Sequence, residues 1–509
     1  MPFLIYQSNM SDYTIIRNNQ TIPIESIPVL KYDDFLLQNT SILNSESHHC
    51  VNYYGYLIQD KIKLICCIAD DSNSTILISS CEIEQDATKY SSFSAKNLAF
   101  QFFERELHEN FGINYTDHPW LKPLRFAFDR FDKNLEIKNY LFYQIQSEEL
   151  HEVGVGPIHA GIIEPGHFRF ICNGEQILHL EIQHGFAHRG METLFLNKKK
   201  LLQRTILAES IAGDTVVGHA TAFVNLWESL CTYEADEDLK FSRTLALELE
   251  RIAVHTGDLS GICTDIAYQL GSSVFGRLRT PIINFFQIWC GNRIAKGLIR
   301  VGNNHFHFSE AMGQQLEKIF KDFETDFTEM FTELKELPSA LSRLEKTGEV
   351  SREQAISIGT IGMVARTSGI FRDIRATHPH DLYHQFNHQP IIKKHGDVYS
   401  RVQIRDEEIR QSIAHIRQLL KKIPLEIINR KPLNEPQKNS FTLSLIEGWR
   451  GEICHCAVTD NEGELIHYKI KDPSIHNWMA LAVAVRNNEI SDFPICNKSF
   501  NLSYCGNDL

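Results

Sequence analysis

The sequence predicts an α+β protein, in which a small N-terminal α/β domain is followed by a mainly α-helical bundle domain with peripheral β-hairpins. The first observation behind this prediction is length, because 509 residues exceed what one hydrophobic core usually serves. The second is a charged stretch around 130–150 that is typical of a connector. The third is a run of long amphipathic patterns after it. We therefore expect domains at 1–135 and 151–509, with a linker at 136–150.

The N-terminal part mixes short β-rich runs with one helical pattern. The runs KLICCIAD and STILISS favour strands. Within 94–113, Phe102, Phe103 and Leu107 form an apolar face, and Gly112 supplies a stop signal. This combination indicates a small α/β domain.

The C-terminal part begins with turn-rich sequence and continues with long helical patterns. Closely spaced Gly and Pro after Gly154, with a turn at Asn173-Gly174, indicate β-hairpins. Apolar residues recur at helical spacing, and Leu245, Leu249 and Ile252 mark one such face. A bundle of antiparallel helices edged by small sheets follows from these patterns. Three helices are expected, within 238–259, 310–334 and 406–423.

Composition and charge exclude several classes of protein. Apolar residues make up 43% and charged residues 23%, the balance of a soluble globular protein. We find no uninterrupted apolar window of about 18 residues and no secretory signal at the start, so we expect neither a membrane span nor secretion. The net charge of −13 argues against nucleic-acid binding. The twelve cysteines include no C-x-x-C pair, and alternation places Cys454 and Cys456 on one side of a strand as core thiols.

Four separated stretches resemble one superfamily. Residues 103–119, FERELHENFGINYTDHP, are similar to the signature of the C-type subunit of complex I and its hydrogenase relatives. GPIHAGIIEPGHFRF with HGFAHRGMETL resembles the start of the large subunit of group 4 membrane-bound hydrogenases. GTIGMVARTSGIFRDIRATHPHDLY and EGWRGEICHCAVTD resemble regions that those subunits share with the D-type subunit of complex I. The chain is thus similar to a fused C/D-type subunit of a complex I-like NADH:quinone oxidoreductase and to large subunits of the hydrogenase-4 and formate hydrogenlyase kind.

The resemblance implies a setting for the chain. It would be a peripheral subunit on the cytoplasmic side of the cell membrane. Its partners would be a B-type iron-sulfur small subunit, a ferredoxin-like subunit and antiporter-like membrane subunits. Iron-sulfur clusters would belong to these partners, this chain would bind no cofactor, and quinone is a candidate substrate.

The nickel ligands of hydrogenases have no counterparts here. Those enzymes bind their metal through two C-x-x-C motifs, and the soft metal requires thiolates. The resemblance places the first two ligand positions at Ala212 and Thr215, and the two near the C-terminus at Ser503 and Gly506. The one cysteine nearby is Cys505, one residue away from the second of these C-terminal positions. We therefore expect a chain without nickel.

The emptied site leaves two functions open. One is a redox role, for which the resemblance suggests a quinone held by a histidine of the hairpin loop and a tyrosine. The usual tyrosine position falls at Gly213, so Tyr504 is the substitute that we consider. The other is a non-catalytic scaffold that couples conformational change to the membrane arm. The candidate site residues, suited to proton relay or to hydrogen-bonding a small polar substrate, are His159, Glu164, His167, Asp214, His219 and Tyr504.

Overall fold

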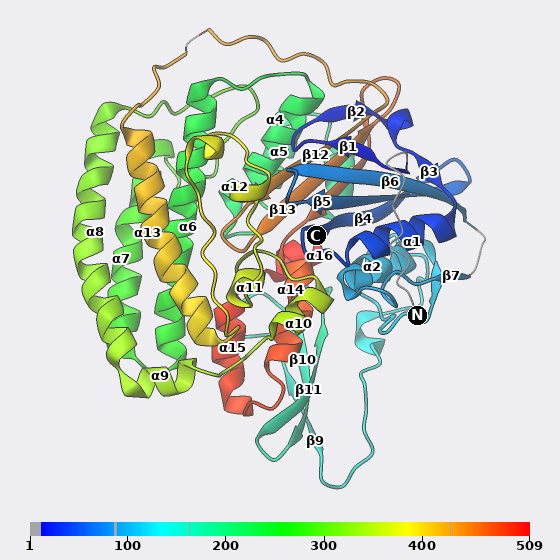
Figure 1. The fold of residues 1–509 in the computed structure, drawn as a ribbon, viewed down its shortest axis with the longest axis horizontal. Helices are drawn as coiled ribbons and strands as arrows, with labels where there is room; N and C mark the ends of the chain where they lie inside the picture. Colours follow the sequence, from blue (N-terminus) through cyan, green and yellow to red (C-terminus); the bar gives the residue numbers. More distant parts are fainter. Residues whose placement is uncertain (1–11, 86–88, 162, 428) are drawn as a thin grey trace.

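A computed structural model describes residues 12–85, 89–161, 163–427 and 429–509. A sheet-rich N-terminal part lies against a second sheet formed near the C-terminus, and long helices stand beside them (Figure 1). The predicted α+β fold is confirmed. Among the described residues, no helix is both long and apolar enough to cross a membrane. The division into domains at 135 and 151 stays a prediction.

The N-terminal sheet has two covered faces. Its strand order is β1-β6-β5-β4, with β3 parallel to β6. On one face, Phe35 of α1 (Tyr32–Ile42) and Phe103 of α2 (Gln101–Phe111) join a core with Leu64. On the other face, Ile65 and Cys67 pack toward the C-terminal sheet. The strands are β1 (Thr14–Ile16), β3 (Val29–Leu30), β4 (His48–Ile58), β5 (Lys61–Asp70) and β6 (Thr75–Glu84).

Helix α2 confirms the predicted helical pattern. Phe102, Phe103 and Leu107 are buried, as their spacing predicted. The helix ends at Gly112, whose φ of 73° lies in the left-handed region that glycine adopts without strain.

The C-terminal sheet takes one strand from the N-terminal part. Its order is β14-β13-β12-β2, formed by β14 (Leu465–Lys471), β13 (Glu452–Thr459), β12 (Ser440–Glu447) and β2 (Thr21–Pro23). Strand β13 alternates as predicted: Cys454 and Cys456 share one buried face with Sγ atoms 3.6 Å apart, and His455 points to the other side. The two ends of the chain are therefore joined by a shared sheet.

Four long helices form the bundle seen on the left of Figure 1. They are α6 (Glu237–Asp265), α7 (Gln269–Cys290), α8 (Glu310–Glu336) and α13 (Val398–Leu420). The predicted face of α6 is buried. Helix α13 begins eight residues before the predicted start, because Asp397 caps it by accepting a hydrogen bond from the N–H of Ser400 at 2.8 Å.

The remaining elements surround the candidate site. The predicted hairpin is confirmed as β10 (His167–Asn173) and β11 (Gln176–Gln183), with β9 (His151–Val155) beside β10. Helix α5 (Val216–Leu230) packs on β12 and β13. The shorter elements are β7 (Lys89–Ser91), β8 (Asn114–Thr116), α3 (Met191–Asn197), α4 (Leu201–Ala208), α9 (Pro338–Leu344), α10 (Arg352–Ile358), α11 (Gly362–Thr367), α12 (Ile374–Thr377), α14 (Ser474–Ala484), α15 (Phe493–Phe500) and α16 (Tyr504–Asp508).

Candidate functional site

Glu164 joins the hairpin loop to the C-terminal segment. Its carboxylate accepts hydrogen bonds from the backbone N–H groups of Tyr504 and Cys505, both at 2.9 Å. The Ser503 hydroxyl accepts the N–H of Gly506 at 2.9 Å. The first N–H groups of a helix lack partners within the helix, so these two side chains complete the start of α16.

The two loop histidines hold the loop in shape. His159 donates from Nε2 to the carbonyl of Gly166 at 2.8 Å, and His167 donates from Nδ1 to the carbonyl of Gly156 at 3.0 Å. Gly156 has a φ of 90°, and a Cβ there would lie 2.3 Å from the Gly166 oxygen. Nε2 of His167 is buried without a partner among the described residues, and burial lowers the pKa of this imidazole.

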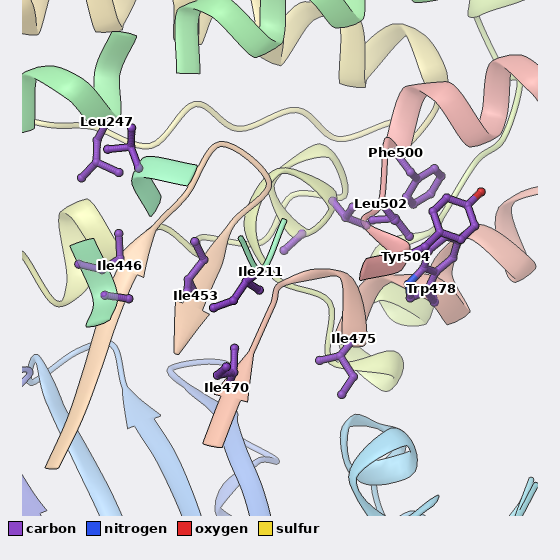
Figure 2. Close-up of a cluster of buried hydrophobic side chains, with 14 of the residues drawn as sticks. Ile211, Leu247, Ile446, Ile453, Ile470, Ile475, Trp478, Phe500, Leu502 and Tyr504 are labelled. Atoms are coloured by element: carbon purple, nitrogen blue, oxygen red, sulfur yellow. The ribbon is translucent and has the colours of Figure 1, made fainter. Parts of the chain in front are cut away.

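Tyr504 lies in a cluster of buried side chains, next to Trp478 (Figure 2). Its ring centroid is 4.8 Å from that of Trp478 and 6.3 Å from that of Phe168. A Cβ at Gly166 would lie 2.4 Å from the tyrosine ring, so the loop packs directly on it. Burial raises the pKa of its phenol, and a side-chain hydrogen bond with Asn497 opposes this effect in part. The hydroxyl is therefore neutral.

Asp214 is bound by an arginine that the sequence had not singled out. Arg450 makes two parallel contacts with the carboxylate, at 2.7 and 2.5 Å, and donates to Oγ1 of Thr215 at 3.0 Å. The guanidinium is buried over the ring of Trp449, 4.0 Å from its centroid. The guanidinium of Arg450 thus contacts both Asp214 and Thr215, in the first of the two stretches that lack the nickel-ligand cysteines.

His219 belongs to a fully buried chain of hydrogen bonds. Its Nε2 is 3.1 Å from Oδ2 of Asp472, and its Nδ1 is 3.1 Å from Nε2 of His455. Nδ1 of His455 in turn accepts from the hydroxyl of Tyr468 at 2.7 Å. One proton arrangement satisfies the chain: Tyr468 donates to His455, His455 to His219, and His219 to Asp472. Burial lowers the pKa of His455 far below its usual value, which keeps this imidazole neutral.

The second pair of emptied ligand positions lies against this chain. A Cβ on Gly506 would lie 2.6 Å from Cγ of Asp472, and the N–H of Ser503 donates to Oγ of Ser474 at 2.8 Å. Asp508 of α16 has partners of its own. Its carboxylate accepts the N–H groups of Gly185 and Ala187, both at 2.9 Å.

The predicted residues form three linked groups rather than one open cavity. Glu164 contacts Tyr504, Asp214 contacts Arg450, and His219 contacts Asp472. Two hollows of about 690 and 220 Å³ border the N-terminal part, and neither is lined by His167, Asp214 or Tyr504.

The chemistry of these positions does not fit a thiolate-bound metal. Ala212 and Gly506 carry no donor side chain, and Thr215 and Ser503 carry hydroxyls, whereas nickel of this kind requires soft sulfur ligands. In the part of the chain that the structure describes, no three or more His, Cys, Asp or Glu side chains are grouped to hold a metal ion.

Sequence reasoning missed Arg450, Asp472, His455 and Tyr468. All four lie in or beside the C-terminal stretches that carry the resemblance. Their partners Asp214 and His219 lie more than 200 residues earlier, so no local spacing connects them. The sequence offered one signal for these residues, namely that Arg450 lies in a turn between Trp449 and Gly451.

In sequence, the chain is similar to subunits D and C/D of NADH-quinone oxidoreductase and to hydrogenase components. Residues 265–445 match the family described as respiratory-chain NADH dehydrogenase, 49 Kd subunit. The resemblance predicted from the sequence is confirmed by this match and by the relatives, which carry the names of both kinds of protein.

Three relatives illustrate this similarity. Hydrogenase-4 component G of Escherichia coli (strain K12) is 25% identical over 448 residues, covering 84% of this chain and 77% of the relative. Formate hydrogenlyase subunit 5 of the same organism is 25% identical, covering 84% and 78%. The C/D subunit of NADH-quinone oxidoreductase from Phocaeicola vulgatus is 26% identical, covering 83% and 88%. The name of this last relative describes a joined C and D chain, which is the arrangement that the sequence predicted.

Proposed function

We propose that this chain is a catalytic-arm subunit of a membrane-associated complex I-like oxidoreductase, in which electron transfer to a quinone is coupled to ion translocation. One observation supports the proposal: the loop and α16 hold His167 and Tyr504 close to Gly166, and the buried Nε2 of His167 lacks a partner among the described residues. A quinone headgroup takes two electrons and two protons to become a quinol. Buried groups that can donate a hydrogen bond or relay a proton are what this chemistry needs.

The two side chains have complementary roles in this proposal. The neutral phenol of Tyr504 donates a hydrogen bond to one carbonyl of the headgroup. His167 keeps its proton on Nδ1, which donates to Gly156, so its Nε2 is the atom that takes up a proton and delivers it to the reduced ring. Entry of the headgroup requires the loop to open from Tyr504, since their contact is tight.

The partners in this proposal follow from the resemblance. Electrons come from iron-sulfur clusters in a B-type small subunit and a ferredoxin-like subunit, and antiporter-like membrane subunits carry the ion. This chain supplies no cofactor. It lies peripherally on the cytoplasmic side of the membrane and is not a nickel-iron hydrogenase; stoichiometric nickel in the purified assembly would contradict that part of the proposal.

The test is electron transfer from NADH, ferredoxin or formate to quinone in membranes that contain the assembly. His167→Ala and Tyr504→Phe should each lower the rate by about 10²-fold, the usual contribution of one positioned proton donor. His305→Ala, at an exposed position, is the control and should leave the rate unchanged. Normal rates in both His167→Ala and Tyr504→Phe would contradict the proposed redox role.

A second candidate is the non-catalytic scaffold, which a different observation favours. Asp214 is paired with Arg450, and Tyr504 is 5% exposed in a packed aromatic cluster, so Asp214 has a structural partner and Tyr504 fills space as a core residue does. Under this function the two site variants leave electron transfer intact, while variants that disturb the packing reduce assembly of the complex. The same membranes distinguish the two outcomes.

A further inference from the structure

A small hollow lies where the N-terminal part meets β11 and α14. Its volume is about 220 Å³, and its walls are mainly apolar and aromatic. Phe102 comes from α2, Trp120 from the segment after β8, and Trp478, Met479 and Ala482 from α14. The volume corresponds to about seven water molecules in the liquid, which is room for one aromatic ring and its substituent.

Arg105 brings an unpaired positive charge to this hollow. The side chain is 3% exposed, its Nε donates to the carbonyl of Lys122 and its Nη2 to the carbonyl of Pro123, both at 2.8 Å. Its guanidinium also lies 5.1 Å from the ring centroid of Phe102. No carboxylate of the described residues forms an ion pair with it, and burial lowers its pKa. An arginine stays charged in a protein, so a buried guanidinium of this kind lacks an anion.

The neighbouring carboxylates are engaged elsewhere. Glu104 accepts hydrogen bonds from Ser94 and Ser92, and Glu106 pairs with Arg125 at 2.8 Å. Glu181 also lines the hollow, but its oxygens accept from Nζ of Lys122, the hydroxyl of Tyr140 and the N–H of Tyr143 at 2.7, 2.8 and 2.7 Å. Glu181 and Glu109 act on Arg105 electrostatically but form no ion pair with it, so its guanidinium has no carboxylate in direct contact among the described residues.

Two further wall residues have unused hydrogen-bonding atoms. Both ring nitrogens of His184 and Nε1 of Trp478 are without a partner among the described residues, and these side chains are 2% and 1% exposed. Burial lowers the pKa of His184 far below its usual value, so the imidazole is neutral and offers one donor. Arg486 adds a cation at the rim. The lining thus combines apolar walls, excess positive charge and spare donors.

We propose that this hollow binds a small apolar carboxylate. The carboxylate would pair with the guanidinium of Arg105, and the apolar body would lie against Phe102, Trp120 and Trp478. Charge-assisted hydrogen bonds from arginine to a carboxylate are among the strongest polar contacts in proteins, and here they would form out of water. Neither His167 nor Tyr504 lines the hollow, although its wall residue Trp478 contacts the Tyr504 ring, and the proposed carboxylate binding does not depend on the redox function.

Calorimetric titration of the full chain with sodium benzoate tests the proposal. Benzamide is the matched probe, because it has nearly the same shape without the charge. We expect saturable binding of one benzoate, with benzamide at least tenfold weaker. Equal affinity for benzoate and benzamide would overturn the proposal. So would the absence of benzoate binding up to about 10 mM, since a dissociation constant of that size corresponds to only about 3 kcal/mol of binding free energy.

Two variants locate the binding. Arg105→Gln should abolish the preference for benzoate, but this change also removes the contacts to Lys122 and Pro123 and can disturb folding. Ala482→Phe avoids that difficulty, since it fills the hollow from α14 and leaves Arg105 in place. It should weaken benzoate binding more than tenfold, whereas the same change at the exposed Ala414 of α13 should not. Unchanged affinity in Ala482→Phe would place the benzoate elsewhere and refute the site.

Discussion

Single buried carboxyls near the candidate site differ in their protonation. Glu250 accepts the N–H groups of Val217 and Gly218 at the start of α5, at 2.8 and 3.2 Å. Burial nevertheless raises its pKa to about 8, and the nearby charge of Asp214 adds to this effect. Glu250 is therefore protonated at neutral pH, unlike Asp472, whose pKa is lowered despite burial by the hydrogen bond from His219.

Glu250 makes stability depend on pH. Its folded-state pKa lies above the ordinary value of 4.5, so the folded chain binds the proton more tightly than the unfolded chain. Its contribution to stability is present at low pH and is lost as the pH rises from about 4.5 through about 8. From pH 5 to pH 9, the free energy of unfolding should fall in both proteins. The fall should be a few kcal/mol smaller in Glu250→Gln than in the unmodified chain. Urea unfolding at the two pH values measures the difference, and identical pH dependence would contradict the raised pKa.

At the scale of elements, α16 depends on a side chain from another part of the chain. This helix of five residues is too short to be stable alone, and Glu164 supplies the acceptor for its first two N–H groups. When the hairpin loop moves away, α16 therefore loses the acceptor for these two N–H groups.

Glu164→Ala should loosen this contact locally. The N–H groups of Tyr504 and Cys505 lose their acceptor, so their hydrogen exchange should become at least tenfold faster, with little change in global stability. Exchange measured by mass spectrometry on the C-terminal peptide detects this. Glu152→Ala in β9 removes an exposed carboxylate and should leave that peptide unchanged; protection that persists in Glu164→Ala would show that α16 is held by packing alone.

The elements that the sequence predicted are those with a clear period. Helix α6 repeats Leu245, Leu249 and Ile252 at helical spacing, and strand β13 alternates Cys454 and Cys456 with His455, so these spacings identify them although both elements are largely buried. Helix α5 is buried almost throughout, and α7 contains Pro281, so neither gives a clean helical pattern. The sequence predicted which residues belong to the candidate site, but not which partners they contact. Contacts such as that of Asp214 with Arg450 depend on tertiary packing.

At the scale of the whole molecule, a buried ionic joint connects the N-terminal part to the rest. Glu106 of α2 pairs with Arg125 at 2.8 Å and with Lys469 of β14. Arg125 also donates from Nε to the carbonyl of Asn507 in α16, at 2.9 Å. The joint therefore connects α2, the C-terminal sheet and the candidate site, and it adds to the shared strand β2.

Breaking this ionic joint should allow the N-terminal part and the helical bundle to unfold separately. Glu106→Gln removes the nearer of the two carboxylates that Arg125 and Lys469 share and leaves them Glu192, at 3.8 and 3.1 Å. The cost should therefore stay below the about 3–5 kcal/mol that is typical when a buried charge loses its whole ion pair. We expect urea unfolding to become biphasic and limited proteolysis to cut near 136–150 at lower denaturant concentration, because the N-terminal part would undock before the bundle unfolds. Glu136→Gln is the matched control: its pair with Lys138 is exposed on both sides, so stability should stay within about 0.5 kcal/mol. A single cooperative transition with normal stability in Glu106→Gln would mean that β2 and apolar packing, rather than the ionic joint, hold the molecule together.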